Sequence, residues 1–197
     1  MGMASGTLYG TRGVGIEMDA RLMLGVRSGD QKSFGMLLSR HRLPVMRFLG
    51  RMVGNQAVAE ELSQDVFLRV YRSRERYSPT ARFTTWLFRI AKHRGLNWLR
   101  DERHERACEP LDLNAPMQVR SREASLEERL IHGGKGEEIR KAILRLPAKQ
   151  RAAVLMHKYE EMGYAQIANA LGCSESAVKS LLFRAYETLR GRLAHYA

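Results

Sequence analysis

The sequence predicts an all-α protein made of two small helical domains joined by a flexible linker. Apolar residues recur at three- and four-residue steps along most of the chain, which is the spacing of amphipathic helices. No run alternates apolar and polar residues with period two, so strands are not expected. A stretch rich in proline and glycine separates two helical blocks, and 197 residues suffice for two small cores.

Changes in composition along the chain indicate where the domains begin and end. Residues 1–24, rich in Gly, Ser and Thr near the start, are expected to be a flexible lead-in to a first domain over 25–106. Residues 107–136 hold two prolines and several glycines with little periodic burial, so they are expected to be a linker with a short helix near 125–130. Residues 137–197 form the second domain.

Three helices are expected in the first domain, over residues 31–53, about 57–77, and from Thr84 or Thr85 to about 103. In the first of them Pro44 should kink or divide the helix. Ser78 and Pro79 should end the second helix, and a threonine should cap the start of the third.

Four shorter helices are expected in the second domain, at about 137–145, 148–159, 164–171 and 175–193. The last two fit a helix-turn-helix. Ala168 is small where two helices would cross, Gly172 can adopt the positive φ that ends the first helix, and Ser174 can cap the second. Val178 would fill the angle between the helices.

The second helix of this motif divides into a packing face and an outward face. The outward face offers cations, hydroxyls and an aromatic ring, which suit the major groove of duplex DNA. Its candidate contact residues are Ser176, Lys179, Ser180, Phe183 and Arg184. The alternative is a plain antiparallel helix pair with a solvated charged face, in which Phe183 is tucked against a neighbour.

The third helix of the first domain is basic and aromatic. Residues 82–106 hold seven basic and three acidic residues, with Trp86, Phe88 and Trp98 among them. Cations beside aromatic rings suit single-stranded nucleic acid, whose unstacked bases expose their faces, and Asn97 can read a base edge. The alternative is that both tryptophans belong to the core of an amphipathic helix.

The overall charge favours one class of partner, and the absence of catalytic motifs argues against an enzyme. The 33 Lys and Arg outnumber the 21 Asp and Glu, a formal charge of +12 that favours a polyanionic partner. The sequence has no P-loop, HExxH or GxSxG motif, and His104 and Cys108 lack a second pair of metal ligands. We therefore expect no enzyme activity, no metal and no cofactor.

The sequence also indicates where the protein works. It has no apolar run long enough to predict membrane insertion, and its two isolated cysteines are typical of a cytoplasmic protein.

Three segments together carry a resemblance to a known family. They are the acidic-polar run from Ala59 to Arg72, the run Phe83-Thr-Thr-Trp-Leu-Phe-Arg-Ile-Ala-Lys-His-Arg-Gly-Leu-Asn-Trp-Leu-Arg100, and Leu146-Pro-Ala-Lys-Gln-Arg-Ala-Ala-Val-Leu155 followed by the helix-turn-helix. From about residue 31 to the C-terminus the chain resembles an extracytoplasmic-function (ECF) sigma factor. These are small two-domain members of the sigma-70 family, which direct bacterial RNA polymerase to promoters.

The resemblance implies a role for each part of the chain. The first domain would correspond to region two, and its second helix would dock on the β′ clamp helices of core polymerase through Glu61, Leu62, Gln64, Asp65 and Leu68. The third helix would melt and read the −10 promoter element through Trp86, Lys92, His93, Arg94, Asn97 and Arg100. The second domain, region four, would read the −35 element as duplex through the outward residues named above, with the β flap as a further polymerase contact.

The resemblance also implies regulation and leaves one rival function. A cognate anti-sigma factor would be the regulatory partner, and it could hold this cytoplasmic protein at the membrane. Lys179 stands where many members have arginine, and lysine cannot form the same bidentate fork. The alternative is an autonomous helix-turn-helix regulator that binds operator DNA without polymerase; it would leave the first domain without a role.

Overall fold

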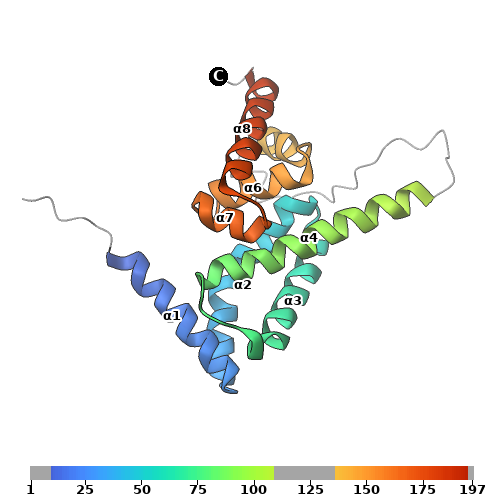
Figure 1. The fold of residues 1–197 in the computed structure, drawn as a ribbon. Coiled ribbons are helices and arrows are strands. Elements are labelled where there is room, and N and C mark those ends of the chain that lie inside the picture. Colours follow the sequence, from blue (N-terminus) through green and yellow to red (C-terminus); the bar gives the residue numbers. More distant parts are fainter. Residues whose placement is uncertain (1–9, 109–135, 195–197) are drawn as a thin grey trace, which may run out of the picture.

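The computed structural model describes residues 10–108 and 136–194, and within these ranges every regular element is a helix. The N-terminal helices α1 to α4 form one group and the helices after residue 135 form a second group above it (Figure 1). Within the described ranges no helix is long and apolar enough to cross a membrane. The predicted all-α architecture is confirmed.

The first helix, α1 (Gly10–Arg27), corrects the expected lead-in over residues 1–24. Its Met23 is buried against the other N-terminal helices, and so is its Asp19. The Asp19 carboxylate lies 3.0 Å from Nε2 of His41 and 3.1 Å from Arg40, both on α2. The sequence did not predict this helix because its several glycines have a low helix propensity. Tertiary contacts with α2 hold it in place.

The second helix, α2 (Gln31–Val53), has the predicted bounds and runs through Pro44 without a break. Pro44 lacks only the backbone hydrogen bond to the carbonyl four residues earlier, and the buried side chains that follow it keep the helix packed. Asp30 caps the start by accepting from the backbone N–H of Lys32 at 2.9 Å. Gly54 ends the helix in the left-handed conformation, at φ 79°.

The third helix, α3 (Gln56–Arg72), ends earlier than the expected residue 77, and a short 3-10 turn, η1 (Arg74–Arg76), follows it. The next helix, α4 (Phe83–Cys108), starts one residue before the threonines that were expected to cap it. That expectation is wrong, because Phe83 is itself buried and Thr85 lies inside the helix with almost no exposure. The start of α4 is therefore set by core packing.

The C-terminal group begins with a helix over residues 136–144 and continues with α6 (Ala148–Lys158), α7 (Tyr164–Leu171) and α8 (Glu175–Arg192). These bounds match the predicted ones to within one residue at nearly every end. The linker expected over 107–136 overlaps α4 at its start and the helix over 136–144 at its last residue. Residues 109–135 between them, including the short helix expected near 125–130, lie outside the described residues.

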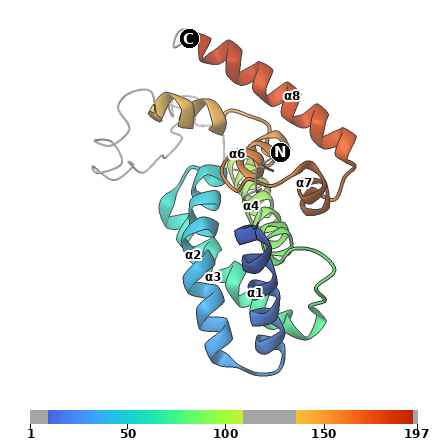
Figure 2. The ribbon, with the colours of Figure 1, turned by 90° about the vertical axis from the view of Figure 1, so that its left-hand side faces the viewer.

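The two helical groups pack against each other. The helices α6 and α7 lie between α8 and the N-terminal helices in both ribbon views (Figures 1 and 2). The buried apolar side chains of both groups form one continuous cluster. The two domains expected from sequence are thus in direct contact in this structure.

Candidate nucleic-acid interface

The helix-turn-helix has the local geometry that its sequence predicts. Gly172 ends α7 at φ 71° and ψ 44°, and its backbone N–H donates to the carbonyl of Ala168 at 2.8 Å. The hydroxyl of Ser174 accepts from the backbone N–H of Ala177 at 3.2 Å and so caps α8. Val178 is fully buried in the angle between the helices. These contacts fix the angle between α7 and α8.

The start of α7 has a cap that the sequence analysis did not single out. The side-chain oxygen of Gln166 accepts from the backbone N–H of Gly163 at 2.9 Å, which is the return half of a capping box. Both helices of the motif therefore begin at defined residues.

One face of α8 is free of packing contacts within the protein. Phe183 is 68% exposed, the largest exposure among the bulky apolar side chains described. It is therefore not tucked against a neighbour. The other four predicted contact residues are exposed as well: Ser176, Lys179, Ser180 and Arg184. All five lie on the outward side of the helix.

The opposite face of α8 anchors the helix. Val178, Leu182 and Ala185 are buried against α6 and α7. The hydroxyl of Tyr186 lies 3.0 Å from Nδ1 of His157 on α6. This packing presents the exposed face rigidly, as groove reading requires.

Of the six residues predicted to meet single-stranded DNA, four share one face of α4 and two lie beside that face. Helical spacing places four of them along one face: Trp86, His93, Asn97 and Arg100. His93 and Arg100 are exposed there. Lys92 and Arg94 lie on the two flanks of this face.

Trp86 is half-buried and takes part in an aromatic cluster. Its ring lies 5.1 Å from that of Tyr77 and 5.9 Å from that of Phe83. Such edge-to-face contacts stabilise the start of α4. The core interpretation that the sequence left open therefore accounts for much of this half-buried side chain, which helical spacing places in line with His93.

The two flanks of α4 face different neighbours. Arg94 is paired with Asp65 of α3. Lys92 is half-buried on the other flank, and the pKa of its ammonium is lowered by burial and by the nearby cations Arg89 and Lys149. Lys149 belongs to α6, so this flank faces the C-terminal domain.

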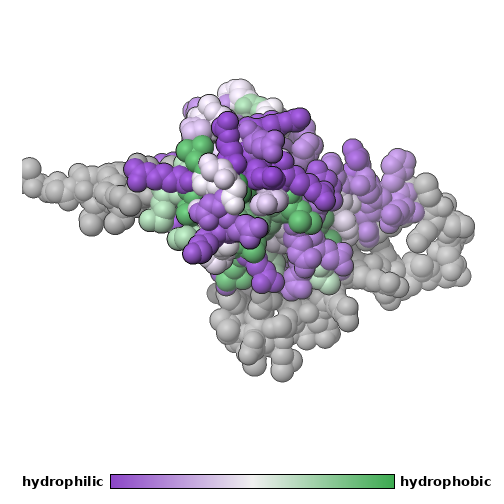
Figure 3. Space-filling model, turned by 90° about the horizontal axis from the view of Figure 1, so that it is seen from below, coloured by the Kyte–Doolittle hydropathy of each residue, from purple (hydrophilic) through white to green (hydrophobic). Residues whose placement is uncertain are grey.

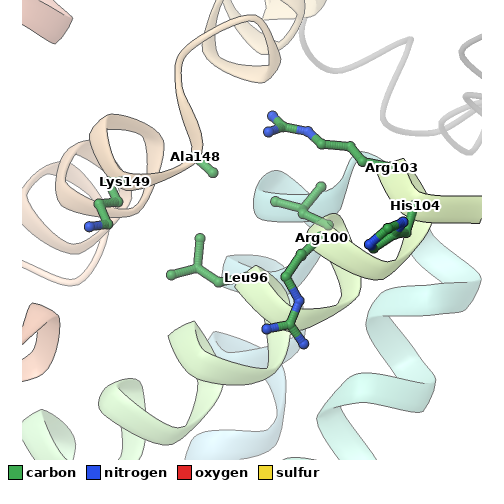
Figure 4. Close-up of a pocket in the computed structure, with 7 residues that line it drawn as sticks. Leu96, Arg100, Arg103, His104, Ala148 and Lys149 are labelled. Atoms are coloured by element: carbon green, nitrogen blue, oxygen red, sulfur yellow. The ribbon is translucent and has the colours of Figure 1, made fainter. Parts of the chain in front are cut away.

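A pocket of about 460 Å³ lies between α4 and the start of α6 (Figure 4). Its apolar lining comes from Leu96, Leu99 and Ala148, and its rim carries basic residues. The basic residues are Arg100, Arg103, His104 and Lys149. In Figure 4 the ends of Arg100 and Lys149 point to different sides, while Arg103 extends toward the gap between the helices. The cations therefore do not converge on one point.

The residues predicted to bind polymerase lie on α3, and four of the five share its outer face. Glu61 and Gln64 are exposed, Leu68 is 53% exposed, and Asp65 is partly exposed. Leu62 is only 6% exposed and packs in the core. Its assignment to a docking surface is a misplacement, because it lies about 100° around the helix from Glu61. Figure 3 shows the neighbouring end of the N-terminal domain as mainly hydrophilic, with small hydrophobic groups.

The structure reveals a buried arginine that the sequence analysis did not single out. Arg151 on α6 is 7% exposed and donates to the carbonyls of Leu144 and Leu146 in its own domain and of Met52 in α2. Burial, with a smaller contribution from Arg103, lowers the pKa of its guanidinium to about 10, so it is charged at neutral pH. In the sequence, its burial was indicated by its position directly before the apolar residues 152–156.

No group of three or more His, Cys, Asp or Glu side chains is arranged to hold a metal ion in the part of the chain that the structure describes. The site is thus built from basic, aromatic and hydroxyl side chains.

Comparisons with known proteins cover both domains. Residues 37–105 match the family described as Sigma-70 region 2, and residues 136–189 match Sigma-70, region 4. The RNA polymerase sigma factor CarQ of Myxococcus xanthus is 35% identical over 164 residues, which cover 83% of this chain and 91% of CarQ. The ECF RNA polymerase sigma-E factor of Escherichia coli is 28% identical over 183 residues, 89% of this chain and 94% of that protein.

Solved structures show the same fold. CnrH, determined in complex with the cytosolic domain of CnrY, superposes with a TM-score of 0.67 at 25% identity, covering 91% of this chain and 99% of CnrH. The sigma factor RpoE of Bartonella quintana, determined with the anti-sigma factor NepR, has a TM-score of 0.64 at 20% identity and covers 83% of this chain and 98% of that one.

Proposed function

Because the chain belongs to the ECF group of the sigma-70 family of RNA polymerase sigma factors, we propose that its two helical domains divide promoter recognition between them. The observation that carries this proposal is that one chain holds an exposed recognition helix and a separate basic, aromatic helix. As a sigma factor it acts with polymerase and is not an autonomous regulator, which would leave α1 to α4 without a role.

The C-terminal domain, residues 137–197, would read the −35 element as duplex. Phe183 and Arg184 are exposed near the middle of the outward face of α8, and Lys179 lies one turn earlier. An arginine can bind guanine bidentately, a lysine can bind one acceptor or a phosphate, and an exposed ring can contact a thymine methyl group. The hydroxyl of Ser180 donates to the carbonyl of Ser176 at 3.1 Å and keeps its acceptor capacity for a base or a water.

The N-terminal domain, expected over residues 25–106 and including α1 in the structure, would open and read the −10 element. His93, Asn97 and Arg100 follow one another along α4, and the half-buried Trp86 lies at the start of the same face. Contact of an unstacked base with the Trp86 ring, together with neutralisation of phosphates by the cations, would favour an unpaired strand over duplex.

The outer face of α3 would bind core polymerase. Glu61, Gln64 and Leu68 combine one charge, one amide and one exposed apolar side chain, which is the composition of a polar interface with a small hydrophobic centre. Through family resemblance we assign this face to the β′ clamp helices and the C-terminal domain to the β flap.

Regulation and location follow from the same resemblance. We propose a cognate anti-sigma factor as a partner; CnrH, at 25% identity, was solved with the cytosolic domain of CnrY. We also propose that the chain works in the cytoplasm, where polymerase acts. It would supply no catalytic group of its own, because initiation uses the polymerase active site.

An in vitro transcription experiment tests the proposal. Purified full-length protein and bacterial core polymerase are incubated with a library of genomic fragments, and the transcripts are compared with those made by core alone. New start sites preceded by two shared, spaced elements are expected. Tight binding to duplex DNA by the protein alone, without initiation that depends on core polymerase, would contradict it.

A further inference from the structure

Asp19 of α1 is a buried carboxylate that connects α1 to α2. The two helices lie alongside each other in both ribbon views (Figures 1 and 2). Asp19 is 5% exposed, and its carboxylate lies 3.0 Å from Nε2 of the buried His41 and 3.1 Å from the guanidinium of Arg40. A buried carboxylate is tolerated only where it is paired and hydrogen-bonded, so these contacts hold the Asp19 side chain in one place.

His41 extends this connection to the start of α4. The centroid of its ring lies 5.3 Å from that of Phe83, the first residue of α4. Phe83 is 1% exposed, and its ring lies 5.9 Å from that of Trp86. In a close-packed cluster, a ring cannot shift without displacing its neighbours. The His41 ring, which Asp19 holds, therefore affects where Trp86 lies.

A second connection from α1 to Trp86 runs through Tyr77. The Tyr77 ring is 2% exposed and lies 6.3 Å from that of Phe83 and 5.1 Å from that of Trp86. Burial raises the pKa of its phenol and, to a smaller degree, so does the Asp19 carboxylate, which is therefore within electrostatic reach of the ring. Arg27, the last residue of α1, donates to the backbone carbonyl of Tyr77 at 3.5 Å.

The position of the Tyr77 ring depends on what packs around it. Its buried hydroxyl has no hydrogen-bond partner among the residues that the structure describes. Residues 78–82, between the buried Tyr77 and Phe83, are all exposed. This segment is thus anchored at one end next to α1 and at the other next to α2. A change in either anchor would move Trp86 relative to the rest of the proposed −10 face.

We propose that α1, through Asp19 and Arg27, positions Trp86 for contact with an unpaired base and so supports opening of the −10 element. The proposal rests on the proposed function of α4. Asp19 is a positioning residue, since it contacts His41 and Arg40 and not DNA. An aromatic ring binds an unpaired base well only when the side chains around it hold it in place.

Initiation on two templates separates positioning from folding. Holoenzyme is reconstituted from the full-length protein and bacterial core polymerase, and a promoter found in the transcription experiment is used as duplex and with its −10 element premelted by mismatches. Asp19→Ala should lower initiation on the duplex about threefold to tenfold, part of what the stacking of one base contributes, and change it less than about twofold on the premelted template. A folding defect would lower both equally, and that result would overturn the proposal.

Two further variants serve as controls. Arg40→Ala removes the other partner of Asp19, a side chain that is 37% exposed, and leaves the contact with His41. It should initiate like the parent on both templates. Asp19→Asn keeps the size of the side chain and can accept a hydrogen bond from Nε2 of His41, so it should restore most of the initiation on the duplex. Equal losses in Asp19→Ala and Arg40→Ala would contradict the proposal.

Arg27→Ala tests the same positioning without a substitution in the core. Arg27 is exposed, so this variant is expected to fold even if Asp19→Ala does not. Loss of its hydrogen bond to Tyr77 should lower initiation on the duplex about twofold, near the lower limit for one hydrogen bond, and leave the premelted template unaffected. Unchanged initiation on the duplex would refute the connection through Tyr77.

Fluorescence measures the position of Trp86 directly. The chain has two tryptophans, so Trp86 is the only one in a Trp98→Phe background. There, Asp19→Ala should shift the emission to longer wavelength, because a displaced indole is more exposed to water, and Arg40→Ala should not. Unchanged emission in folded Asp19→Ala would overturn the proposal. Absence of core-dependent initiation by the parent protein would instead count against the sigma function, so the two failures are distinguishable.

Discussion

Asp65 on α3 forms an ion pair with Arg94 on α4, and the same carboxylate pairs with Arg69 at 3.2 Å. Asp65 belongs to the face proposed for polymerase, and Arg94 flanks the face proposed for DNA. The pair therefore joins the two proposed surfaces through one carboxylate.

The strength of this link can be measured with a double-mutant cycle. Urea unfolding of Asp65→Ala, Arg94→Ala and the double variant should give a coupling free energy of about 0.5–1 kcal/mol, since both partners are only partly exposed. The exposed pair of Asp65 with Arg69, one turn apart on α3, serves as a control and should give about 0.3–0.5 kcal/mol. Additive effects of the Asp65 and Arg94 substitutions would mean that the pair contributes nothing.

The recognition helix gives a second prediction. Arg184→Ala should weaken −35 recognition by about 1–3 kcal/mol and leave binding to core polymerase intact. Initiation on templates with and without the −35 element, together with a core-binding assay, measures the two effects. Arg190→Ala is the matched control, because Arg190 is exposed on the same helix but paired with Glu187. An equal loss of core binding in Arg184→Ala would contradict the assignment of Arg184 to the −35 element.

Two leucines on α3 should respond in opposite ways. Leu68→Ser should weaken core binding with little loss of stability, because the side chain is 53% exposed. Leu62→Ala should lower the free energy of unfolding by about 2–5 kcal/mol, as expected for a truncated core leucine. Core-binding titrations and urea unfolding of both variants separate the roles. Unchanged core binding by Leu68→Ser would mean that polymerase docks elsewhere.

Glu160 predicts a pH dependence of stability. Burial raises the pKa of its carboxyl from 4.5 to about 7, although Arg51 acts in the opposite direction. Between these pH values the folded protein holds a proton that the unfolded chain has released, so stability falls as pH rises from about 4.5 to about 7.

Glu160→Gln should remove this contribution. At about 1.4 kcal/mol per pKa unit the whole shift would correspond to about 3.5 kcal/mol, but Glu160 is only partly buried and solvent screens its charge. The variant should therefore be more stable than the parent by about 1–2 kcal/mol at pH 8 and closer to it at pH 4.5. Thermal and urea unfolding across this range test the difference. A constant difference between the two proteins at every pH would contradict the raised pKa.

The sequence predicted local features best. The glycine and serine that bound the turn after α7, and the residue pattern of α8, act through their immediate neighbours, so spacing alone located them. The start of α4 was misplaced because Phe83 is buried beside His41 of α2 and Tyr77, which local propensity does not report. Helix α1 was missed for the same reason, since its contact from Asp19 reaches His41 on the next helix, 22 residues along the chain.

The candidate site was predicted in part. The five outward residues of α8 are all exposed, because a helix on the surface of the domain keeps one face free. The residues of α4 and α3 were chosen from sequence blocks, and such blocks include inward-facing residues such as Leu62. The hydrogen bond from Arg151 to the carbonyl of Met52 joins positions far apart in the chain, so no periodicity could predict it.

Helix α4 is continuous over 26 residues, a length of about 39 Å at 1.5 Å per residue. Its first turn is held in the aromatic cluster and by the hydrogen bond from Gln166 of α7 to Thr85, its middle carries the pair with Asp65, and its second half lines the pocket beside the start of α6. Its helical backbone runs without a break from Phe83 to Cys108, so a displacement at one end would be passed along the helix to the other. A protein that grips α4 at one end would tilt the other end, and an engineered break in its middle should uncouple the two halves of the molecule mechanically.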